Sequence, residues 1–184
     1  MNLWALFIPI IYYLQPNVRS SRLILLAVTA AFVIVDFFRL HITGAKEVFI
    51  LFFGSFSRRQ ELHRINGATY LMLGCLFTSL LFQKPVFVAA VTYIIVGDTF
   101  AALLGQSIKG PKLFRKTLVG SLSFLLSCIG LALLMHFFLN EMESLPLYNL
   151  LIGAGSATVL EALPVPWDDN FSVPILAGAV MSLV

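Results

Sequence analysis

Apolar stretches separated by short polar loops run along the whole chain. A helix needs about 20 mostly apolar residues to cross the hydrocarbon core of a bilayer, and most stretches that lack Asp, Glu, Lys and Arg approach this length. The pattern therefore predicts an all-α, polytopic membrane helix bundle with about seven transmembrane helices. Their centres fall near residues 8, 30, 74, 94, 128, 153 and 178, and the first and last segments are short.

Two apolar segments need a separate interpretation. The stretch 48–57 is too short to span a membrane alone and is flanked by charged pairs at 46–47 and 58–59. Such a segment is typical of a helix in the membrane interface, so we predict a short interfacial or re-entrant helix. Residues 1–14 lack the basic start of a secretory signal, and we interpret them as a membrane segment.

Composition supports a membrane protein. Hydrophobic residues make up 59% of the chain and charged residues 11%, whereas an ordinary globular domain is about 25% charged. The net charge of +3 is spread along the chain without a run of five or six like charges, which argues against nucleic-acid binding. Cys75 and Cys128 lie in apolar stretches and predict neither a disulfide framework nor a metal-thiolate site. We expect a single transmembrane domain over residues 1–184.

Basic residues divide the loops into two groups. Cytoplasmic loops carry an excess of Lys and Arg. Loops after the first, third and fifth predicted helices hold three basic residues, whereas those after the second, fourth and sixth hold nine. We therefore place the second group in the cytoplasm, with the N-terminus inside and the C-terminus outside; in a bacterium this is the inner membrane. The unusual polar residues fall on the same side: Asp36, His63, Asp98, Glu161, Asp168 and Asp169.

Ionisable groups within or beside membrane spans are costly, and each is a functional-site hypothesis. Asp36 and Arg39 stand three residues apart at the end of the second predicted span, where they could simply pair with each other. Four more polar residues precede the third span: Glu61, His63, Arg64 and Asn66. The spacing of Glu61, Arg64 and Asn66 predicts a shared helical face. We expect part of this cluster to be functional, the alternative being capping or snorkelling groups.

Asp98 lies inside an apolar helix, directly after Gly97. A buried carboxylate needs a cationic partner, and the following loop supplies four cations: Lys109, Lys112, Arg115 and Lys116. The same loop runs from Gly105 to Thr117, where a long helix begins. Flexible glycines, a helix N-terminus and basic side chains together make an anion site suited to phosphates. An ordinary cytoplasmic loop would explain the cations but not the glycines or Asp98.

An acidic loop complements the basic loop at 105–117. Glu161, Asp168, Asp169 and Asn170 lie within ten residues and have no basic neighbour in that loop. Hard divalent cations such as Mg²⁺ are held by carboxylates together with substrate phosphates. A basic loop and an acidic loop on one membrane side, with Asp98 between them, form the arrangement that phosphoryl transfer needs.

Four segments carry a family resemblance: Asp36-x-x-Arg39; Arg59-x-Glu61-x-x-Arg64-x-Asn-Gly67-Ala-Thr-Tyr70; Val96-Gly97-Asp98-Thr-x-Ala-Ala-x-x-Gly105 with Lys116-Thr117-x-x-Gly120-Ser121; and Glu161 with Asp168-Asp169-Asn170-x-x-x-Pro174. In this order they resemble the CTP-dependent lipid kinases, the membrane family of dolichol (polyprenol) kinase, phytol kinase and diacylglycerol kinase. The resemblance implies CTP as phosphate donor, a divalent cation such as Mg²⁺, and a membrane lipid alcohol as acceptor, either polyprenol-like or diacylglycerol.

We therefore expect an integral membrane kinase that transfers the γ-phosphate of CTP to a lipid hydroxyl at the cytoplasmic face. The expected catalytic residues are Asp98, Glu161, Asp169, Glu61 and Arg64. The expected metal ligands are Asp98, Asp168 and Asp169. The expected nucleotide-binding residues are Gly97, Gly105, Lys109, Lys112, Arg115, Lys116, Thr117, Gly120 and Ser121. Further polar residues of the site are Asp36, Arg39, His63, Asn66 and Asn170.

Two other functions remain open at this stage. The Gly-Asp and Lys-Thr-x-x-Gly-Ser portions are also similar to CDP-diacylglycerol synthase, a phosphatidate cytidylyltransferase, whose longer Asp-rich C-terminal signature is absent here. A small ion-coupled transporter would instead use Asp98 and Glu161 as a cation or proton relay. Transporters are often built from internal repeats, and the sequence has no convincing one. The oligomeric state is open, and a homo-oligomer is one option.

Overall fold

The structure is a computed structural model that describes residues 3–42, 44, 64–108, 110–114, 116–139, 142 and 144–184. Within these residues the elements are η1 (Leu3–Leu6), α1 (Phe7–Leu14), α2 (Val18–His41), α4 (Gly67–Leu81), α5 (Lys84–Ser107), β1 (Lys112–Leu113), β2 (Lys116–Thr117), α6 (Leu118–Phe138), α7 (Leu147–Ala162) and α8 (Asp169–Leu183). The predicted all-α class is confirmed, and each of the seven predicted helix centres falls inside one of these helices. The predicted interfacial helix at 48–57 lies outside the described residues.

In the described part of the chain, three helices are long and apolar enough to cross a membrane: α2, α5 and α6. These candidate spans make the chain a multi-pass integral membrane protein. The other helices are shorter: α4 and α8 have 15 residues each and α7 has 16. At about 1.5 Å per residue, 15 residues rise about 22 Å, less than the roughly 30 Å of the hydrocarbon core. The expectation of seven full spans is therefore confirmed for three helices only.

Capping side chains set the first residues of α4 and α8. The side chain of Asn66 accepts a hydrogen bond from the backbone N–H of Ala68 and so starts α4. Asp168 caps α8 in the same way, through the N–H of Asn170. A capping side chain satisfies a backbone donor that has no partner within the helix, which makes these two positions favourable starting points.

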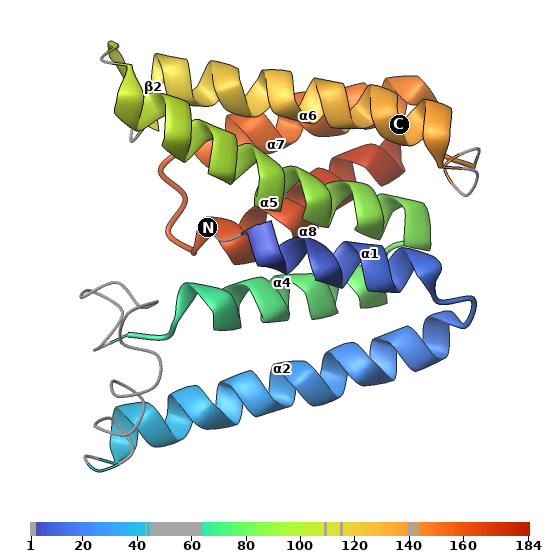
Figure 1. Cartoon of the computed structure of the whole chain (residues 1–184), viewed down its shortest axis with the longest axis vertical. Coiled ribbons are helices and arrows are strands. Elements are labelled where there is room, and N and C mark those ends of the chain that lie inside the picture. Colours follow the sequence, from blue (N-terminus) through green and yellow to red (C-terminus); the bar gives the residue numbers. More distant parts are fainter. Residues whose placement is uncertain are drawn as a thin grey trace.

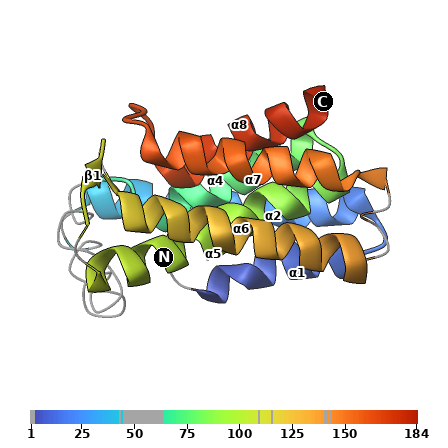
Figure 2. The same cartoon turned by 90° about the horizontal axis from the view of Figure 1, so that it is seen from above.

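The helices form one bundle in which successive helices run in opposite directions (Figures 1 and 2). At one end of the bundle α2, α5 and α7 finish and α4, α6 and α8 begin; we call it the site end, and it lies at the left in Figure 1. The helix ends that flank the loops predicted to be cytoplasmic lie at this end. The bundle therefore gathers polar residues that lie far apart in the sequence.

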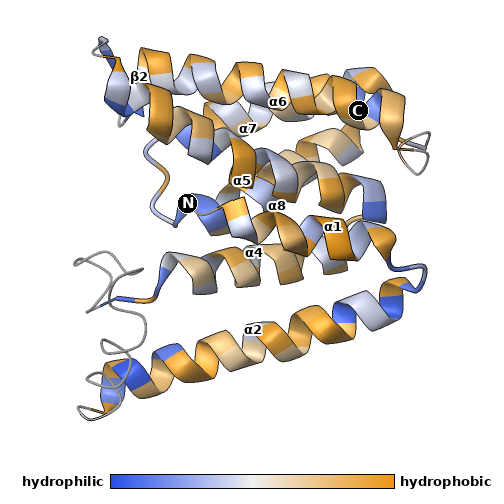
Figure 3. Ribbon diagram, in the orientation of Figure 1, coloured by the Kyte–Doolittle hydropathy of each residue, from blue (hydrophilic) through white to orange (hydrophobic). Residues whose placement is uncertain are grey.

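Helix α5 forms the centre of the bundle and contacts α6, α8, α1 and α7. Its apolar window is 72% buried, whereas that of α2 is 22% buried. Helix α2 packs mainly on α4, and Figure 3 shows hydrophobic residues along its middle with hydrophilic residues at both ends. An apolar helix with so little protein around it must face hydrocarbon over much of its surface, because exposing that surface to water is unfavourable.

Candidate active site

A short hairpin joins α5 to α6 at the site end. Strands β1 and β2 pair antiparallel, with Lys112 opposite Thr117 and Leu113 opposite Lys116. Phe114 in the turn has a φ of 54°. The backbone N–H of Leu118 donates to the carbonyl of Pro111 over 2.9 Å and closes the base of the hairpin. This hairpin was not predicted, since the basic segment was expected to be a loop, and two-residue strands leave no periodic signal in a sequence.

Glycines let the hairpin lie directly against the end of α5. A Cβ atom on Gly105 would lie 2.9 Å from Thr117 Oγ1 and 3.2 Å from the Cα atom of Gly120. Thr117 in turn accepts a hydrogen bond from the N–H of Gly120 over 3.1 Å and caps α6. The two glycines thus permit a close approach of α5 to α6. This approach carries Lys116 toward Asp98.

Three carboxylates surround the ammonium group of Lys116. Its Nζ atom lies 2.5 Å from Glu161 Oε1, 3.6 Å from Asp169 Oδ2 and 3.9 Å from Asp98 Oδ1. These side chains come from β2, α7, α8 and α5. Glu161 is 1% exposed, whereas Asp98 is 26% and Asp169 18% exposed. One cation facing three carboxylates leaves this group of four with an excess of negative charge.

The surroundings of Lys116 determine its protonation. Burial lowers the pKa of the Lys116 ammonium, but the neighbouring carboxylates of Glu161, Asp169 and Asp98 outweigh burial and raise the pKa above its ordinary value. Lys116 therefore remains a cation at neutral pH. It holds Glu161 in position and balances part of the charge of the other two carboxylates.

The same group of carboxylates suits a divalent cation. The described residues contain no preformed cluster of three or more His, Cys, Asp or Glu side chains around a common metal position. The Lys116 ammonium stands at the point where Asp98, Glu161 and Asp169 converge, and the buried Oε2 atom of Glu161 has no hydrogen-bond partner among the described residues. Carboxylate oxygens are the ligands that Mg²⁺ prefers. These oxygens are of the chemical type that Mg²⁺ binds, and in the described residues the Lys116 ammonium occupies the position between them.

At the start of α8, two neighbouring aspartates make different contacts. The side chain of Asp168 caps the helix, whereas Asp169 is directed toward Lys116. Asn170 donates from Nδ2 to the carbonyl of Gly67 over 3.4 Å and connects α8 to the start of α4. Of the two predicted metal ligands here, Asp169 is thus the one that the structure brings next to Asp98. Asp168 lies beside it on the wall of the same cavity.

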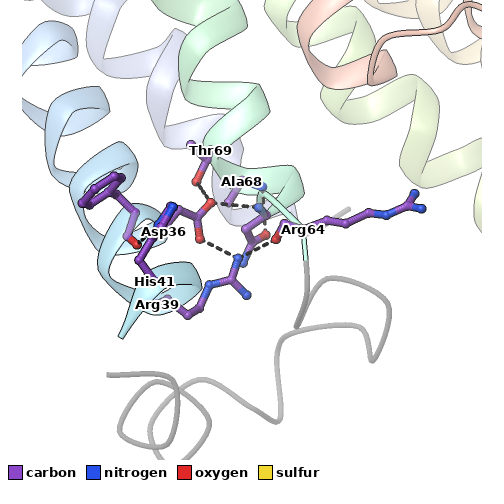
Figure 4. Close-up of polar contacts among 8 residues, drawn as sticks. Asp36, Arg39, His41, Arg64, Ala68 and Thr69 are labelled. Atoms are coloured by element: carbon purple, nitrogen blue, oxygen red, sulfur yellow. Dashed lines mark hydrogen bonds and ion pairs between the residues drawn. The ribbon is translucent and has the colours of Figure 1, made fainter. Parts of the chain in front are cut away.

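A second polar cluster joins α2 to α4 (Figure 4). Asp36 Oδ1 lies 2.7 Å from Arg39 Nη2, so the pairing that the sequence offered for these two residues is present. Asp36 Oδ2 accepts hydrogen bonds from the N–H of Asn66 over 2.8 Å and from the hydroxyl of Thr69 over 2.7 Å. Arg39 donates to the carbonyl of Arg64 over 2.7 Å. The carboxylate is buried and satisfied, which indicates a structural role.

The prediction of a shared helical face for Arg64 and Asn66 was wrong. Both residues precede α4, because the Asn66 side chain caps the helix instead of continuing it. Figure 4 shows the Arg64 side chain pointing away from Asp36 and Arg39. Four further expected site residues, Glu61, His63, Lys109 and Arg115, lie outside the described part of the chain.

One cavity of about 1310 Å³ connects the two polar clusters. It is larger than the roughly 300–1,000 Å³ of a typical small-molecule site. The expected site residues on its wall are Asp36, Asn66, Asp98, Gly105, Lys112, Lys116, Thr117, Gly120, Glu161, Asp168, Asp169 and Asn170. Gly97 and Ser121 are elsewhere: Gly97 packs against the ring of Phe124, and Ser121 is buried in the first turn of α6.

The fold and the site define a multi-pass membrane protein with a large cavity that is lined by carboxylates and lysines at one end of its bundle. Three curated proteins are similar to most of this chain. An uncharacterized protein of Rickettsia prowazekii is 26% identical over 93% of this chain and 85% of its own length. CTP-dependent diacylglycerol kinase 1 of Eremothecium gossypii is 27% identical over 95% of this chain, and that of Saccharomyces cerevisiae is 28% identical over 82%.

The chain is a distant homologue of the CTP-dependent diacylglycerol kinases, at 27–28% identity over most of its length. It spans 62% of the length of the Eremothecium kinase and 59% of the Saccharomyces kinase. No family model and no solved structure matches the chain. The resemblance inferred from the four segments is thus confirmed at the level of the family.

Proposed function

We propose that the protein is a CTP-dependent lipid kinase that transfers the γ-phosphate of CTP to the hydroxyl of a membrane lipid alcohol at the cytoplasmic face. The observation that carries this proposal is the convergence of Asp98, Glu161 and Asp169 on Lys116 at the wall of one cavity. Homology to two kinases that bear this activity in their names supports it. Diacylglycerol is accordingly the first acceptor to test, with polyprenols second.

Phosphoryl transfer depends on positioning and on neutralising the charge of the phosphates. In the proposed reaction the acceptor oxygen forms a bond to the γ-phosphorus, the bond from this phosphorus to the β–γ bridging oxygen breaks, and the hydroxyl proton passes to a carboxylate. Lys112 and Lys116 line the cavity and supply positive charge to the triphosphate. A divalent cation, when bound, neutralises charge on the β- and γ-phosphates.

The exposure of the carboxylates suggests how their roles divide. Asp98 and Asp169 are each partly exposed to the cavity, so these two would hold the cation or take the hydroxyl proton. Glu161 is almost completely buried against Lys116. We therefore assign Glu161 as a positioning residue that orients Lys116, and Asp98 and Asp169 as the groups that touch the substrates.

The test uses purified protein with diacylglycerol or a polyprenol, Mg²⁺ and CTP labelled separately at the α- and γ-phosphates. Label from the γ position alone should enter the lipid extract. The Asp98→Asn variant should lose about 10²-fold or more of this activity while it keeps the unfolding temperature of the wild type. Label from the α position would instead indicate a cytidylyltransferase. Absence of both labels from every lipid, or full activity of Asp98→Asn, would contradict the proposal.

A further inference from the structure

The cavity extends far beyond the charged residues. From Asp36 and Asp98 it continues between α1 and α2 to Gln15 and Ser21, close to the opposite end of both helices. The stretch of α2 from Ser21 to Asp36 corresponds to about 22 Å at 1.5 Å per residue. One leaflet of the hydrocarbon core is about 15 Å thick. The cavity is therefore deep enough for a lipid chain of full leaflet length.

The walls of this extension are single faces of two helices. The residues of α2 that line it follow a helical repeat of three and four: Ser21, Ile24, Leu25, Val28, Ala31, Phe32 and Val35. The residues of α1 do the same: Phe7, Ile8, Ile11 and Tyr12. Residues at such spacing lie on one side of a helix. Two predominantly apolar faces are thus turned toward each other across an open space.

Two polar side chains near these walls bond within the protein, whereas the buried hydroxyl of Tyr12 has no hydrogen-bond partner among the described residues. Thr29 donates its hydroxyl hydrogen bond to the carbonyl of Met72, and Ser21 donates to the carbonyl of Asn17. The long middle part of the wall therefore offers hydrocarbon and few polar partners. Water molecules would form few hydrogen bonds in such a space. An alkyl chain fits it without penalty, because the wall is as apolar as the bilayer that the chain leaves.

The two helices pack on different neighbours. Helix α1 packs on α5, whereas α2 packs mainly on α4. The Asp36–Arg39 cluster connects α2 to the start of α4 at the site end. A lipid that entered from the bilayer between α1 and α2 would have its polar head at the site end.

We propose that the hydrocarbon chain of the lipid acceptor lies between these faces of α1 and α2, with its hydroxyl beside Asp98. This inference rests on the proposed function and adds the location of the acceptor. The inference is supported by the continuity of the apolar space with the carboxylate-lined end of the cavity. A single molecule with a hydroxyl head and a long chain matches both of these parts of the cavity. The face of α2 then determines which chains the enzyme accepts.

The experiment uses diacylglycerol with a photoreactive diazirine midway along one acyl chain, added to the full chain in nanodiscs. A first pair of matched variants places the same large side chain on opposite sides of α2. Ala31 lines the cavity, whereas its neighbour Ala30 is exposed and does not. A second pair on α1 is Ile11, which lines the cavity, and Ile10, which does not. Each residue is replaced by Trp.

The expected result is a saturable label on the facing sides of α1 and α2, located by peptide mapping. Ala31→Trp and Ile11→Trp should each lower the label about tenfold, whereas Ala30→Trp and Ile10→Trp should leave it unchanged. A label that spreads equally over both sides of α2, or that both cavity variants retain, would overturn the inference. A dimer that Ala31→Trp dissociates, without saturable labelling, would also overturn it by making this face an interface between two copies.

Binding and turnover are measured separately, so that the two proposals can fail independently. If wild-type protein shows the expected label but transfers no phosphate from CTP, the lipid site stands and the proposed function is wrong. If phosphate is transferred and Ala31→Trp and Ile11→Trp both keep the wild-type rate and KM for long-chain diacylglycerol, the function stands and the location of the chain is wrong.

Discussion

Replacing Lys116 with Met tests the charge balance of the site directly. The substitution keeps much of the side-chain volume but removes the ammonium group that Glu161, Asp169 and Asp98 share. Glu161 is then a carboxylate with 1% exposure beside two others. Removing one partner of a buried ion pair typically costs about 3–5 kcal/mol. Because Lys116 is 27% exposed, we expect the lower end, about 3 kcal/mol of unfolding free energy.

A double-mutant cycle isolates the contribution of the pair. Glu161→Gln combined with Lys116→Met removes both charges, so the buried carboxylate no longer lacks a cation. The double variant should be more stable than Lys116→Met alone. A charge-assisted hydrogen bond contributes about 1.5–3 kcal/mol, and the coupling energy of the cycle should fall in this range.

Thermal unfolding in detergent, followed by intrinsic fluorescence, measures the cycle. For a chain of this size 1 kcal/mol shifts the unfolding temperature by about 2–4 °C, so Lys116→Met should unfold about 6–12 °C below the wild type. CTP binding, measured in parallel, should also weaken in this variant. Additive effects of the two substitutions, with no coupling energy, would refute the reasoning, because they would mean that Lys116 and Glu161 do not depend on each other.

Three further predictions concern pH, the α2–α4 connection and the hairpin. The pKa of Lys116 is raised above its ordinary value of 10.5, so the charge of Lys116 should stabilise the fold fully at lower pH. This stabilisation should disappear as the pH rises through the raised pKa. The difference in unfolding temperature between wild type and Lys116→Met should therefore be constant near neutrality and shrink only in strongly alkaline buffer. Asp36→Asn removes the carboxylate that pairs with the 2% exposed Arg39 and should cost about 3 kcal/mol of unfolding free energy, measured by thermal unfolding. A loss below about 0.5 kcal/mol would contradict the assigned structural role. Gly105→Ala places a methyl group 2.9 Å from Thr117 Oγ1 and should cost about 1–3 kcal/mol of unfolding free energy and weaken CTP binding. The control Gly130→Ala has nothing within 4 Å of the new Cβ atom and should be neutral or stabilising. Equal behaviour of the two variants would exclude the close approach of α5 and α6 as the reason for Gly105.

Much of the fold can be predicted from the apolar pattern alone. The seven helices lie where the apolar stretches predict them, because a bilayer imposes a length and a composition on any helix that crosses it. The start of α4 could not be predicted in this way, because it depends on the capping hydrogen bond of Asn66, which average hydropathy does not record.

The sequence also determined which residues to examine, because ionisable side chains next to membrane spans are costly and rarely incidental. It could not determine their partners. Asp168 and Asp169 are adjacent and chemically identical, yet one caps α8 and the other faces Lys116. Only the packing of α5, α6, α7 and α8 decides that Lys116 meets Glu161, and only the separation of α1 from α2 creates the apolar extension of the cavity. Contacts between distant segments follow from how helix faces fit together, and this fit is a property of the tertiary structure.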